Sequence, residues 1–508
     1  MIRSCIVALG LSAISLTNPV FAEEAKTAAA PAIPEPAVFS SSKSGTFNGV
    51  KVAYKAVAGD TYIRDAKGKP VATFFTYAYL KDGVKDPSTR PVTFVYNGGP
   101  GSASMWLHMG VFGPRRVVVP SDPADDGAAP YRIIDNPETV LDVTDLVFID
   151  PVGTGLSRPL GDEDPKKHWG VLEDGGSIAE FIRTWIDENN RWNSPKFLAG
   201  ESYGTLRSAV VADKLTNDHD IGLNGIMLIS AVLDYHQSRF QPGAVQAYVS
   251  FLPSYAATAW YHNQLPSKPA NLEAFLDEVR AFASTDYAAA LMAGNRLSAD
   301  EEARIIDKLH QYTGLEKNYI KATNLRIEVF RFFKELMRDE RKVVGRLDSR
   351  YLGDEPDSAG EFFESDPFSD ATGNAFTVAI NDQLKNFFGV KLTDRRYNNS
   401  ARGEKDWGWN WNVWGKELPN GGRFVNVVPM LGSAMRHNPD MHVLVTQGYY
   451  DFATPFYGAE NALAQPEIVK DRVAFTYYES GHMMYVHEPS RLKFLDDIRS
   501  FIEAYDKQ

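Results

Sequence analysis

The chain has 508 residues, 44% of them hydrophobic and 23% charged, and its formal net charge is −12 at pH 7. This composition is ordinary for a globular protein. The length exceeds what one hydrophobic core usually supports, so we expect two domains or one domain with a large insertion. The negative charge argues against nucleic acid or an anionic membrane as a partner, because both would repel it.

The first 22 residues have the pattern of a secretion signal. Arg3 gives a positive start, an apolar run follows from Cys5 to Thr17, and Val20-Phe21-Ala22 fits the small-residue rule at a cleavage site. The run is too short to span a bilayer. We therefore predict a signal peptide at 1–22, export to a bacterial periplasm or to the medium, and no membrane insertion after cleavage.

The residues that follow the signal predict a linker. Residues 23 to about 36 are rich in Ala, Pro and Glu, which disfavour a packed core, and we place a disordered linker at 23–45. The one cysteine of the chain, Cys5, lies inside the predicted signal. The mature protein is therefore expected to contain no disulfide and no thiol nucleophile.

Short apolar runs separated by turn residues predict the strands of a sheet. The runs are 71–80, 92–96, 117–119, 146–149, 197–199, 226–229, 443–446 and 473–477. Most of them lack polar alternation, as expected of strands covered on both faces. Apolar residues recur at helical spacing between Ile178 and Ile186 and again between Leu495 and Ile502. Together these patterns predict an α/β fold whose mostly parallel sheet is flanked by helices.

A long helical segment interrupts this alternation. From 235 to 421 the apolar spacing is helical, with 320–337 as one long candidate helix, and strand-like runs resume only at Val443. We predict a helical cap insertion at 235–421 between two parts of the core, 46–234 and 422–508, lying over the carboxyl edge of the sheet. Near its end lie Trp407, Trp409, Trp411 and Trp414. We expect them to pack the cap onto the core rather than to line a substrate site.

A serine lies in a glycine-rich turn between a predicted strand and a predicted helix. The sequence Gly200-Glu201-Ser202-Tyr203-Gly204 follows the run 197–199 and precedes a helical segment at 205–217. Glycines on both sides allow a turn sharp enough to expose the serine oxygen at the sheet edge. This pattern also occurs by chance in ordinary strand-to-helix turns, so further residues are needed to support catalysis.

Two later residues complete the order Ser, Asp, His found in hydrolases with this turn. Asp451 follows the run 443–446, and His482 follows the run 473–477. Singly, Asp451 could be a turn residue and His482 a packed core residue. Their joint order and their places at strand ends favour a triad in which His482 removes the proton of Ser202 and Asp451 orients the histidine.

The loop Asn97-Gly98-Gly99-Pro100-Gly101-Ser102 follows the run 92–96. Such a loop can present bare backbone N–H groups to a developing oxyanion. A phosphate-binding role is less favoured because the lysine of a P-loop is absent. We predict no metal and no cofactor: His482 and His487 are five residues apart and no H-E-x-x-H motif is present.

These motifs, together with Pro151-Val152-Gly153-Thr154-Gly155-Leu156-Ser157 and Gly481-His482-Met483, resemble those of the serine carboxypeptidases, the family of carboxypeptidase Y. The resemblance runs from Val92 to the C-terminus. It implies an α/β-hydrolase fold with a helical insertion, and removal of C-terminal residues from peptides through an acyl-enzyme.

The resemblance also assigns roles to residues. It implies that the N–H groups of Gly99 and Tyr203 form the oxyanion hole. It implies that Asn97 and Glu201, with Gly98 beside them, bind the carboxylate at the end of the substrate. Glu201 can do this only when protonated, because an ionised carboxylate would repel another one.

The sequence departs from the family at three places. Val111 stands where a glutamate usually pairs with Glu201, Tyr485 where a proline is usual, and Ser102 where a cysteine is usual. Without a carboxylate partner, the pKa of Glu201 is raised by burial alone or very little. We therefore expect a pH optimum above that of the family, or weaker selectivity for a free terminus.

Two alternatives stay open from the sequence. The same triad serves esterases, acyltransferases and other serine peptidases, and a non-catalytic binding protein could retain it as a relic. Peptides or small acyl compounds are the expected substrates. The side-chain preference and the oligomeric state are not readable from the sequence.

Overall fold

The computed structural model describes residues 32–413 and 425–505. The predicted signal peptide, the first part of the predicted linker and Trp414 lie outside the described residues. Within those ranges, no helix combines the length and the apolar character needed to cross a bilayer.

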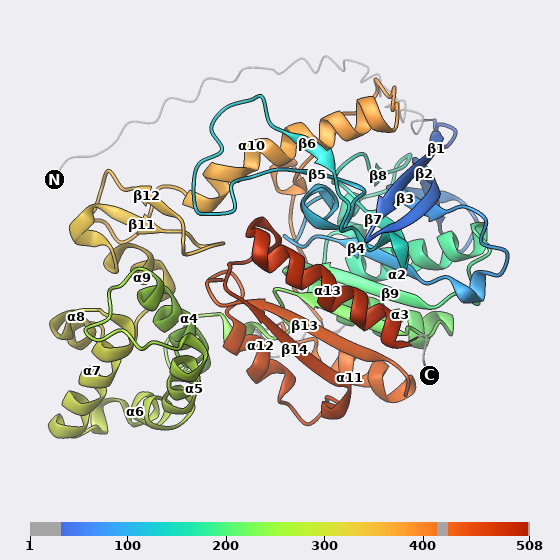
Figure 1. The fold of residues 1–508 in the computed structure, drawn as a ribbon. Coiled ribbons are helices and arrows are strands. Elements are labelled where there is room, and N and C mark those ends of the chain that lie inside the picture. Colours follow the sequence, from blue (N-terminus) through green and yellow to red (C-terminus); the bar gives the residue numbers. More distant parts are fainter. Residues whose placement is uncertain (1–31, 414–424, 506–508) are drawn as a thin grey trace, which may run out of the picture.

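A twisted ten-stranded sheet forms the centre of the molecule (Figure 1). Its strands are β1 (Val38–Phe47), β2 (Val50–Arg64), β3 (Pro70–Lys81), β4 (Val92–Tyr96), β7 (Asp145–Ile149), β8 (Arg158–Pro159), β9 (Lys196–Glu201), β10 (Gly225–Ile229), β13 (His442–Gly448) and β14 (Val473–Tyr478). The order is β1-β2-β3-β7-β4-β9-β10-β13-β14, with β8 paired to β3. From β7 to β14 all neighbours are parallel, whereas β1, β2 and β3 add an antiparallel edge.

Helices cover both faces of this sheet. They are α1 (Met105–Leu107), α2 (Val171–Glu188), α3 (Tyr203–His219), α11 (Val428–His437), α12 (Phe456–Leu463) and α13 (Glu488–Tyr505). The apolar sides of α2, α3, α11 and α12 share one buried cluster with the strands, and α13 belongs to the cluster on the other face. The predicted α/β-hydrolase fold, with a mostly parallel sheet between helices, is confirmed.

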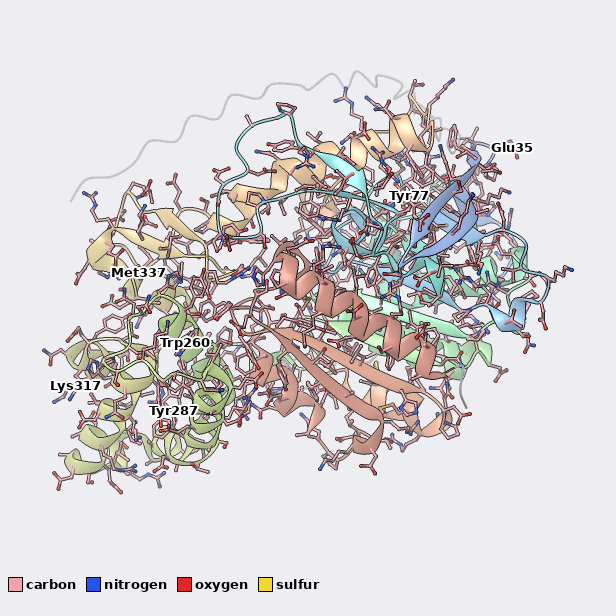
Figure 2. All side chains as sticks on the ribbon, viewed as in Figure 1. Glu35, Tyr77, Trp260, Tyr287, Lys317 and Met337 are labelled. Atoms are coloured by element: carbon pink, nitrogen blue, oxygen red, sulfur yellow. The ribbon has the colours of Figure 1, made fainter. Side chains whose placement is uncertain are left out.

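The insertion after β10 contains a helical lobe, at the left in Figure 1, whose buried cluster also includes residues 449–457 of the core. Its helices are α4 (Gln246–Tyr261), α5 (Leu272–Phe282), α6 (Ala288–Ala293), α7 (Ala299–Thr313), α8 (Lys317–Ala322) and α9 (Val329–Glu335). Trp260 and Tyr287 lie in this lobe, away from the sheet (Figure 2). The Tyr287 hydroxyl donates to the carbonyl oxygen of Leu325 at 2.6 Å, which satisfies the polar group inside an apolar core.

The rest of the insertion does not belong to that lobe. A hairpin of β11 (Lys342–Val344) and β12 (Leu352–Asp354) leads to α10 (Pro367–Asp382), which runs along the top of the molecule in Figure 1. Phe368, Phe376 and Ile380 of α10 are buried in the same cluster as α13. The insertion that was predicted at 235–421 as a helical cap thus contains a helical lobe followed by a segment that packs on the core.

Three local predictions are wrong. Residues 38–45, predicted as linker, form most of β1. Its antiparallel partner β2 was not predicted. In the first half of β2, buried positions alternate with lysines and other exposed residues, so the strand lacks a continuous apolar run. The predicted strand 117–119 contributes only Val117 to β5 (Arg115–Val117), which pairs with β6 (Ile133–Asp135) outside the main sheet. The predicted helix 320–337 is broken, because Asn324 and Leu325 adopt positive φ angles of 52° and 65° between α8 and α9.

The strand register brings the predicted site residues to one edge. Tyr96 at the end of β4 lies opposite Gly200 of β9, so the loop at Asn97 and the turn at Ser202 leave the sheet side by side. Gly448 at the end of β13 lies opposite Tyr478 of β14. The loops that carry Asp451 and His482 therefore begin together at the same carboxyl edge.

A buried ion pair supports this edge from below. Arg207 of α3 is fully buried and its Nε lies 2.6 Å from Oδ2 of Asp174 in α2. Its Nη1 donates to the carbonyl oxygen of Asn97 at 2.5 Å. One guanidinium thus ties two helices to the residue that begins the glycine-rich loop.

Replacing Arg207 by leucine should lower the free energy of unfolding by about 3–5 kcal/mol, because Asp174 would be left buried and unpaired. Urea denaturation followed by tryptophan fluorescence measures this loss. The matched control is Lys214→Met on the same helix, whose ion pair with Asp218 is exposed and should matter by less than about 1 kcal/mol. A loss for Arg207→Leu as small as that of the control would contradict the supporting role.

Candidate active site

Ser202 occupies a strained turn between β9 and α3. Its φ and ψ angles are 60° and −128°, a conformation that costs energy for a residue with a side chain. Its backbone N–H donates to the carbonyl oxygen of Ile229 on β10 at 2.9 Å, which fixes the turn. A Cβ atom at Gly200 would lie 2.3 Å from the carbonyl oxygen of Gly204. Only glycine fits there, and the turn matches the nucleophile elbow expected from the sequence.

His482 and Asp451 are joined by a hydrogen bond. Nδ1 of His482 lies 2.7 Å from Oδ2 of Asp451, and both side chains are buried. Their loops come from β14 and β13, as the sequence predicted. The carboxylate is placed to hold the imidazole in one tautomer with Nε2 unprotonated.

Asp451 has further partners that the sequence did not reveal. Its Oδ1 accepts from the backbone N–H groups of Ala453 at 2.7 Å and Thr454 at 3.0 Å. The Thr454 hydroxyl donates to Oδ2 at 2.7 Å. The position of Thr454, three residues after the aspartate, suits such a turn. These bonds orient the carboxylate toward His482 before any substrate is present.

Ser202 and His482 line the same cavity of about 250 Å³, together with Asn97, Gly99 and Glu201. Among the described residues, no hydrogen bond joins the Ser202 hydroxyl to His482. Catalytic hydrogen bonds are often long without substrate and shorten in the complex. Burial disfavours the charged form of His482, but Asp451 and Glu201 outweigh it, so the pKa of His482 is raised.

The glycine-rich loop approaches the elbow very closely. A Cβ atom on Gly98 would lie 2.4 Å from the N atom of Tyr203 and 2.6 Å from that of Gly204. In the part of the chain that the structure describes, neither the N–H of Gly99 nor that of Tyr203 donates a hydrogen bond. Tyr203 opens α3, where the first amides have no partner within the helix. Both groups are therefore available to an oxyanion beside Ser202.

Glu201 lies buried next to the nucleophile turn with a donor on each oxygen. The Asn97 side-chain amide donates to Oε1 at 2.9 Å, and the Tyr485 hydroxyl donates to Oε2 at 2.7 Å. Asn97 is itself held by the N–H of Leu107, which donates to its Oδ1 at 3.1 Å. The structure therefore brings together the Asn97 and Glu201 pair that the resemblance assigned to carboxylate binding.

Burial raises the pKa of Glu201 to about 7, although a positively charged His482 and the bonds from Tyr485 and Asn97 act in the opposite direction. The sequence left open whether burial alone could raise this pKa without a carboxylate partner. Here burial is the largest cause of the raised pKa and the charge of Asp451 adds to it, so the carboxyl group changes charge near neutral pH.

Tyr485, one of the departures from the family pattern, lies against Gly110, the residue before Val111. A Cβ atom at Gly110 would lie 2.6 Å from the ring of Tyr485, so the ring occupies the space beside the residue that precedes Val111. The hydroxyl of this ring supplies the hydrogen bond to Glu201. The tyrosine is therefore a hydrogen-bond partner that lowers the pKa of Glu201, whereas a second carboxylate would raise it. The sequence contained Tyr485, but nothing in it indicated this contact.

A segment of the insertion holds the loops of His482 and Asp451. The N–H of His482 donates to the carbonyl oxygen of Leu347 at 2.6 Å, and the N–H of Phe452 donates to that of Arg346 at 3.1 Å. Asp348, buried and paired with Arg350, accepts from the N–H of Gly481 at 3.0 Å. Both loops are therefore fixed by backbone contacts to residues 345–351.

The tryptophans near the end of the insertion pack against the core, as expected. The Trp407 ring lies 5.0 Å from that of Trp169, and the Trp409 ring lies edge-on to Tyr203 at 5.4 Å. Trp411 contacts the Tyr203 ring at 6.1 Å. None of the three lines the cavity beside Ser202.

The described residues contain no cluster of three His, Cys, Asp or Glu side chains with the geometry of a metal site.

A family model described as serine carboxypeptidase matches residues 51–496. The chain belongs to the serine carboxypeptidase family. It is 27% identical over 192 residues to serine carboxypeptidase-like 34 of Arabidopsis thaliana, and 30% identical over 140 residues to serine carboxypeptidase-like 20 of the same plant. The first alignment covers 36% of this chain and 36% of the relative. The second covers 26% of this chain and 27% of the relative. The chain thus spans about a third of the length of the curated relatives it matches.

The fold is also that of a solved carboxypeptidase. Kex1(delta)p, a prohormone-processing carboxypeptidase from Saccharomyces cerevisiae, superposes with a TM-score of 0.50 at 16% identity. The superposition covers 89% of this chain and 91% of that one. At this identity the likeness supports the shared fold.

Substituting Gly98 by alanine should slow the reaction of Ser202 with a fluorophosphonate by about 100-fold or more, because the added methyl pushes the loop away from the Tyr203 amide. Gel-based labelling rates measure the effect. Gly176→Ala on α2 is the matched control, since no atom lies within 4 Å of its added Cβ. Equal rates for both variants would show that the close approach is not needed.

Proposed function

We propose that this protein is a serine carboxypeptidase that hydrolyses C-terminal peptide bonds through an acyl-enzyme. The single observation that supports this activity is the place of the Glu201 and Asn97 pair, buried in the same cavity as Ser202 and His482. A hydrolase of simple esters has no need for a protonatable carboxyl group beside its nucleophile. The family membership supports the same assignment.

In the proposed reaction, His482 accepts the hydroxyl proton of Ser202 while the serine oxygen attacks the scissile carbonyl carbon. Asp451 stabilises the imidazolium, and the N–H groups of Gly99 and Tyr203 bind the oxyanion. The imidazolium then protonates the leaving amine, and the C-terminal amino acid departs. Water, deprotonated by His482, attacks the acyl-enzyme and releases the shortened peptide together with the free serine.

Glu201 and Asn97 select the free terminus in this scheme. A protonated Glu201 donates a hydrogen bond to the terminal carboxylate, and the Asn97 amide adjoins it. Below a pH of about 7 most Glu201 side chains are protonated, because burial raises their pKa to about 7. Above that pH the ionised carboxylate repels the substrate.

We further propose that the protein acts after export, in a periplasm or outside the cell. The N-terminal pattern of a positive residue, an apolar run and a small-residue cleavage site supports export. An acyl acceptor other than water remains a possible outcome of the assays below, since the same acyl-enzyme can react with an alcohol or amine.

Ser202→Ala should abolish both fluorophosphonate labelling and peptide hydrolysis, because Ser202 is the hydroxyl at the nucleophile turn and forms the acyl-enzyme in this scheme. The assay compares an N-acylated dipeptide with its C-terminal amide by chromatography. The free acid should be cleaved at least about tenfold faster than the amide, because loss of one charged hydrogen bond reduces kcat/KM by about that factor. Equal cleavage of acid and amide would contradict a carboxypeptidase and leave a general acyl hydrolase.

Tyr485→Phe should change the pH dependence of KM and leave kcat nearly unchanged. The Tyr485 hydroxyl stabilises the ionised form of Glu201 and thereby lowers its pKa. Its loss raises the pKa, so the rise of KM for free-acid peptides should begin at a higher pH than in the wild type. Steady-state assays at a series of pH values measure both constants.

Glu201→Gln is the reference for this test, because glutamine keeps a donor at every pH and its KM should stay flat. A rise of KM at the same pH in wild type and Tyr485→Phe would contradict the role of the tyrosine. A wild-type optimum at about pH 4–5, well below both raised pKa values, would contradict the role of Glu201 and His482 in setting the profile.

A further inference from the structure

Two arginines of the insertion, Arg346 and Arg402, line the cavity that contains Ser202 and His482. The sequence indicated neither. Of the described residues around this cavity, Glu201 is the one acid, and it is protonatable near neutral pH. The protein carries a net charge of −12, yet the charged groups that it presents beside the nucleophile are mainly positive.

Arg402 is anchored to the loop that carries Gly99. Its Nη2 donates to the carbonyl oxygen of Gly99, and its Nε donates to that of Pro100 at 3.0 Å. The neighbouring Ala401 N–H donates to the Gly101 carbonyl oxygen at 2.8 Å. A guanidinium has five N–H donors, so the two carbonyl contacts leave donors for another acceptor.

Arg346 approaches the cavity from the triad side. Its carbonyl oxygen accepts from the N–H of Phe452, next to Asp451, and its own N–H donates to Asp366 at 2.8 Å. The backbone position of Arg346 is therefore fixed relative to the triad, while its side chain reaches solvent. Its positive charge acts on both His482 and Arg402.

Neither guanidinium forms an ion pair with an acid in the described part of the chain. In the ranges that the structure describes, no carboxylate lies within the 4.0 Å ion-pair distance of Arg346 or Arg402. Other arginines of the insertion, Arg350 and Arg395, each have an acid at 2.5 Å. Burial and the charge of Arg346 together lower the pKa of Arg402, so the two side chains repel each other.

We propose that Arg346 and Arg402 form a subsite that binds a carboxylate of the substrate beside the scissile bond. A carboxylate between the two guanidiniums relieves their repulsion and accepts charge-assisted hydrogen bonds in the fork geometry that arginine favours. The carboxylate comes either from an acidic side chain, Asp or Glu, or from the substrate terminus. In the first case the enzyme prefers acidic peptides, and this preference rests on the proposed carboxypeptidase function.

The test uses N-acylated dipeptides that carry Glu or Gln in the last position or in the position before it, each as free acid and as amide. With an acidic side chain in the subsite, wild-type kcat/KM should favour Glu over Gln by about tenfold. Arg346→Gln should remove this preference. Arg402→Gln should remove it too, with an added loss on all substrates because of its contacts to Gly99 and Pro100.

Arg304→Gln is the matched control, because this exposed arginine pairs with Asp286 on the far lobe, and its Glu/Gln ratio should equal that of the wild type. If the variants instead reduce the ratio of free acid to amide, the subsite binds the terminal carboxylate. If neither ratio changes in Arg346→Gln and Arg402→Gln, the proposal is overturned.

Calorimetric binding of the same peptides to Ser202→Ala separates this proposal from the proposed function. The subsite is supported if Ser202→Ala binds Glu peptides more tightly than Gln peptides and the double variant Ser202→Ala/Arg346→Gln does not. This result would hold even if the wild-type protein cleaves no peptide. Hydrolysis without any dependence of binding or turnover on a carboxylate overturns the subsite and leaves the carboxypeptidase in place.

Discussion

The site depends on one close backbone contact, between Gly98 and the first amides of α3. With 2.4 Å between an imagined Cβ and the Tyr203 nitrogen, no residue larger than glycine can occupy the position without moving the loop. The same loop sets the Asn97 side-chain amide against Glu201 at 2.9 Å. Arg207 holds the start of the loop in place, because it donates to the Asn97 carbonyl oxygen and pairs with Asp174. In the proposed function, oxyanion stabilisation and terminus recognition therefore both depend on this contact.

Buried charge is handled differently at the two carboxyl groups of the site. Asp451 accepts hydrogen bonds from its own turn and contacts His482, and these bonds fix the orientation of its carboxyl group. Glu201 has two donors and a strong burial effect, which leave its protonation near balance at neutral pH. The difference lets one carboxylate orient a base while the other changes its charge with the medium. A single tyrosine hydroxyl is part of that balance.

Much of this arrangement could be predicted from the sequence, and the rest could not for physical reasons. The parallel strands are continuous apolar runs and the elbow has a local glycine signature, so the order and the edge position of Ser202, Asp451 and His482 were predictable. β2 was not predicted because lysines occupy exposed positions between its buried residues. The break between α8 and α9 was not predicted because Asn324 and Leu325, rather than a glycine, adopt the positive φ angles. The contact of Tyr485 with Glu201 and the convergence of Arg346 and Arg402 are tertiary, and a single sequence contains no record of such proximity.

The hold of residues 345–351 on the loops of both His482 and Asp451 limits how this enzyme can diverge. The part of the helical lobe that does not contact Phe452 can change without moving the triad, whereas Tyr255 and Phe332 pack on Phe452, next to Asp451. The segment 345–351 itself cannot be deleted or exchanged alone. A chimaera that takes the lobe of a relative should therefore join it upstream of Gly345. A junction further downstream would remove the contacts that hold the loops of His482 and Asp451. Such a chimaera would be inactive whatever its specificity.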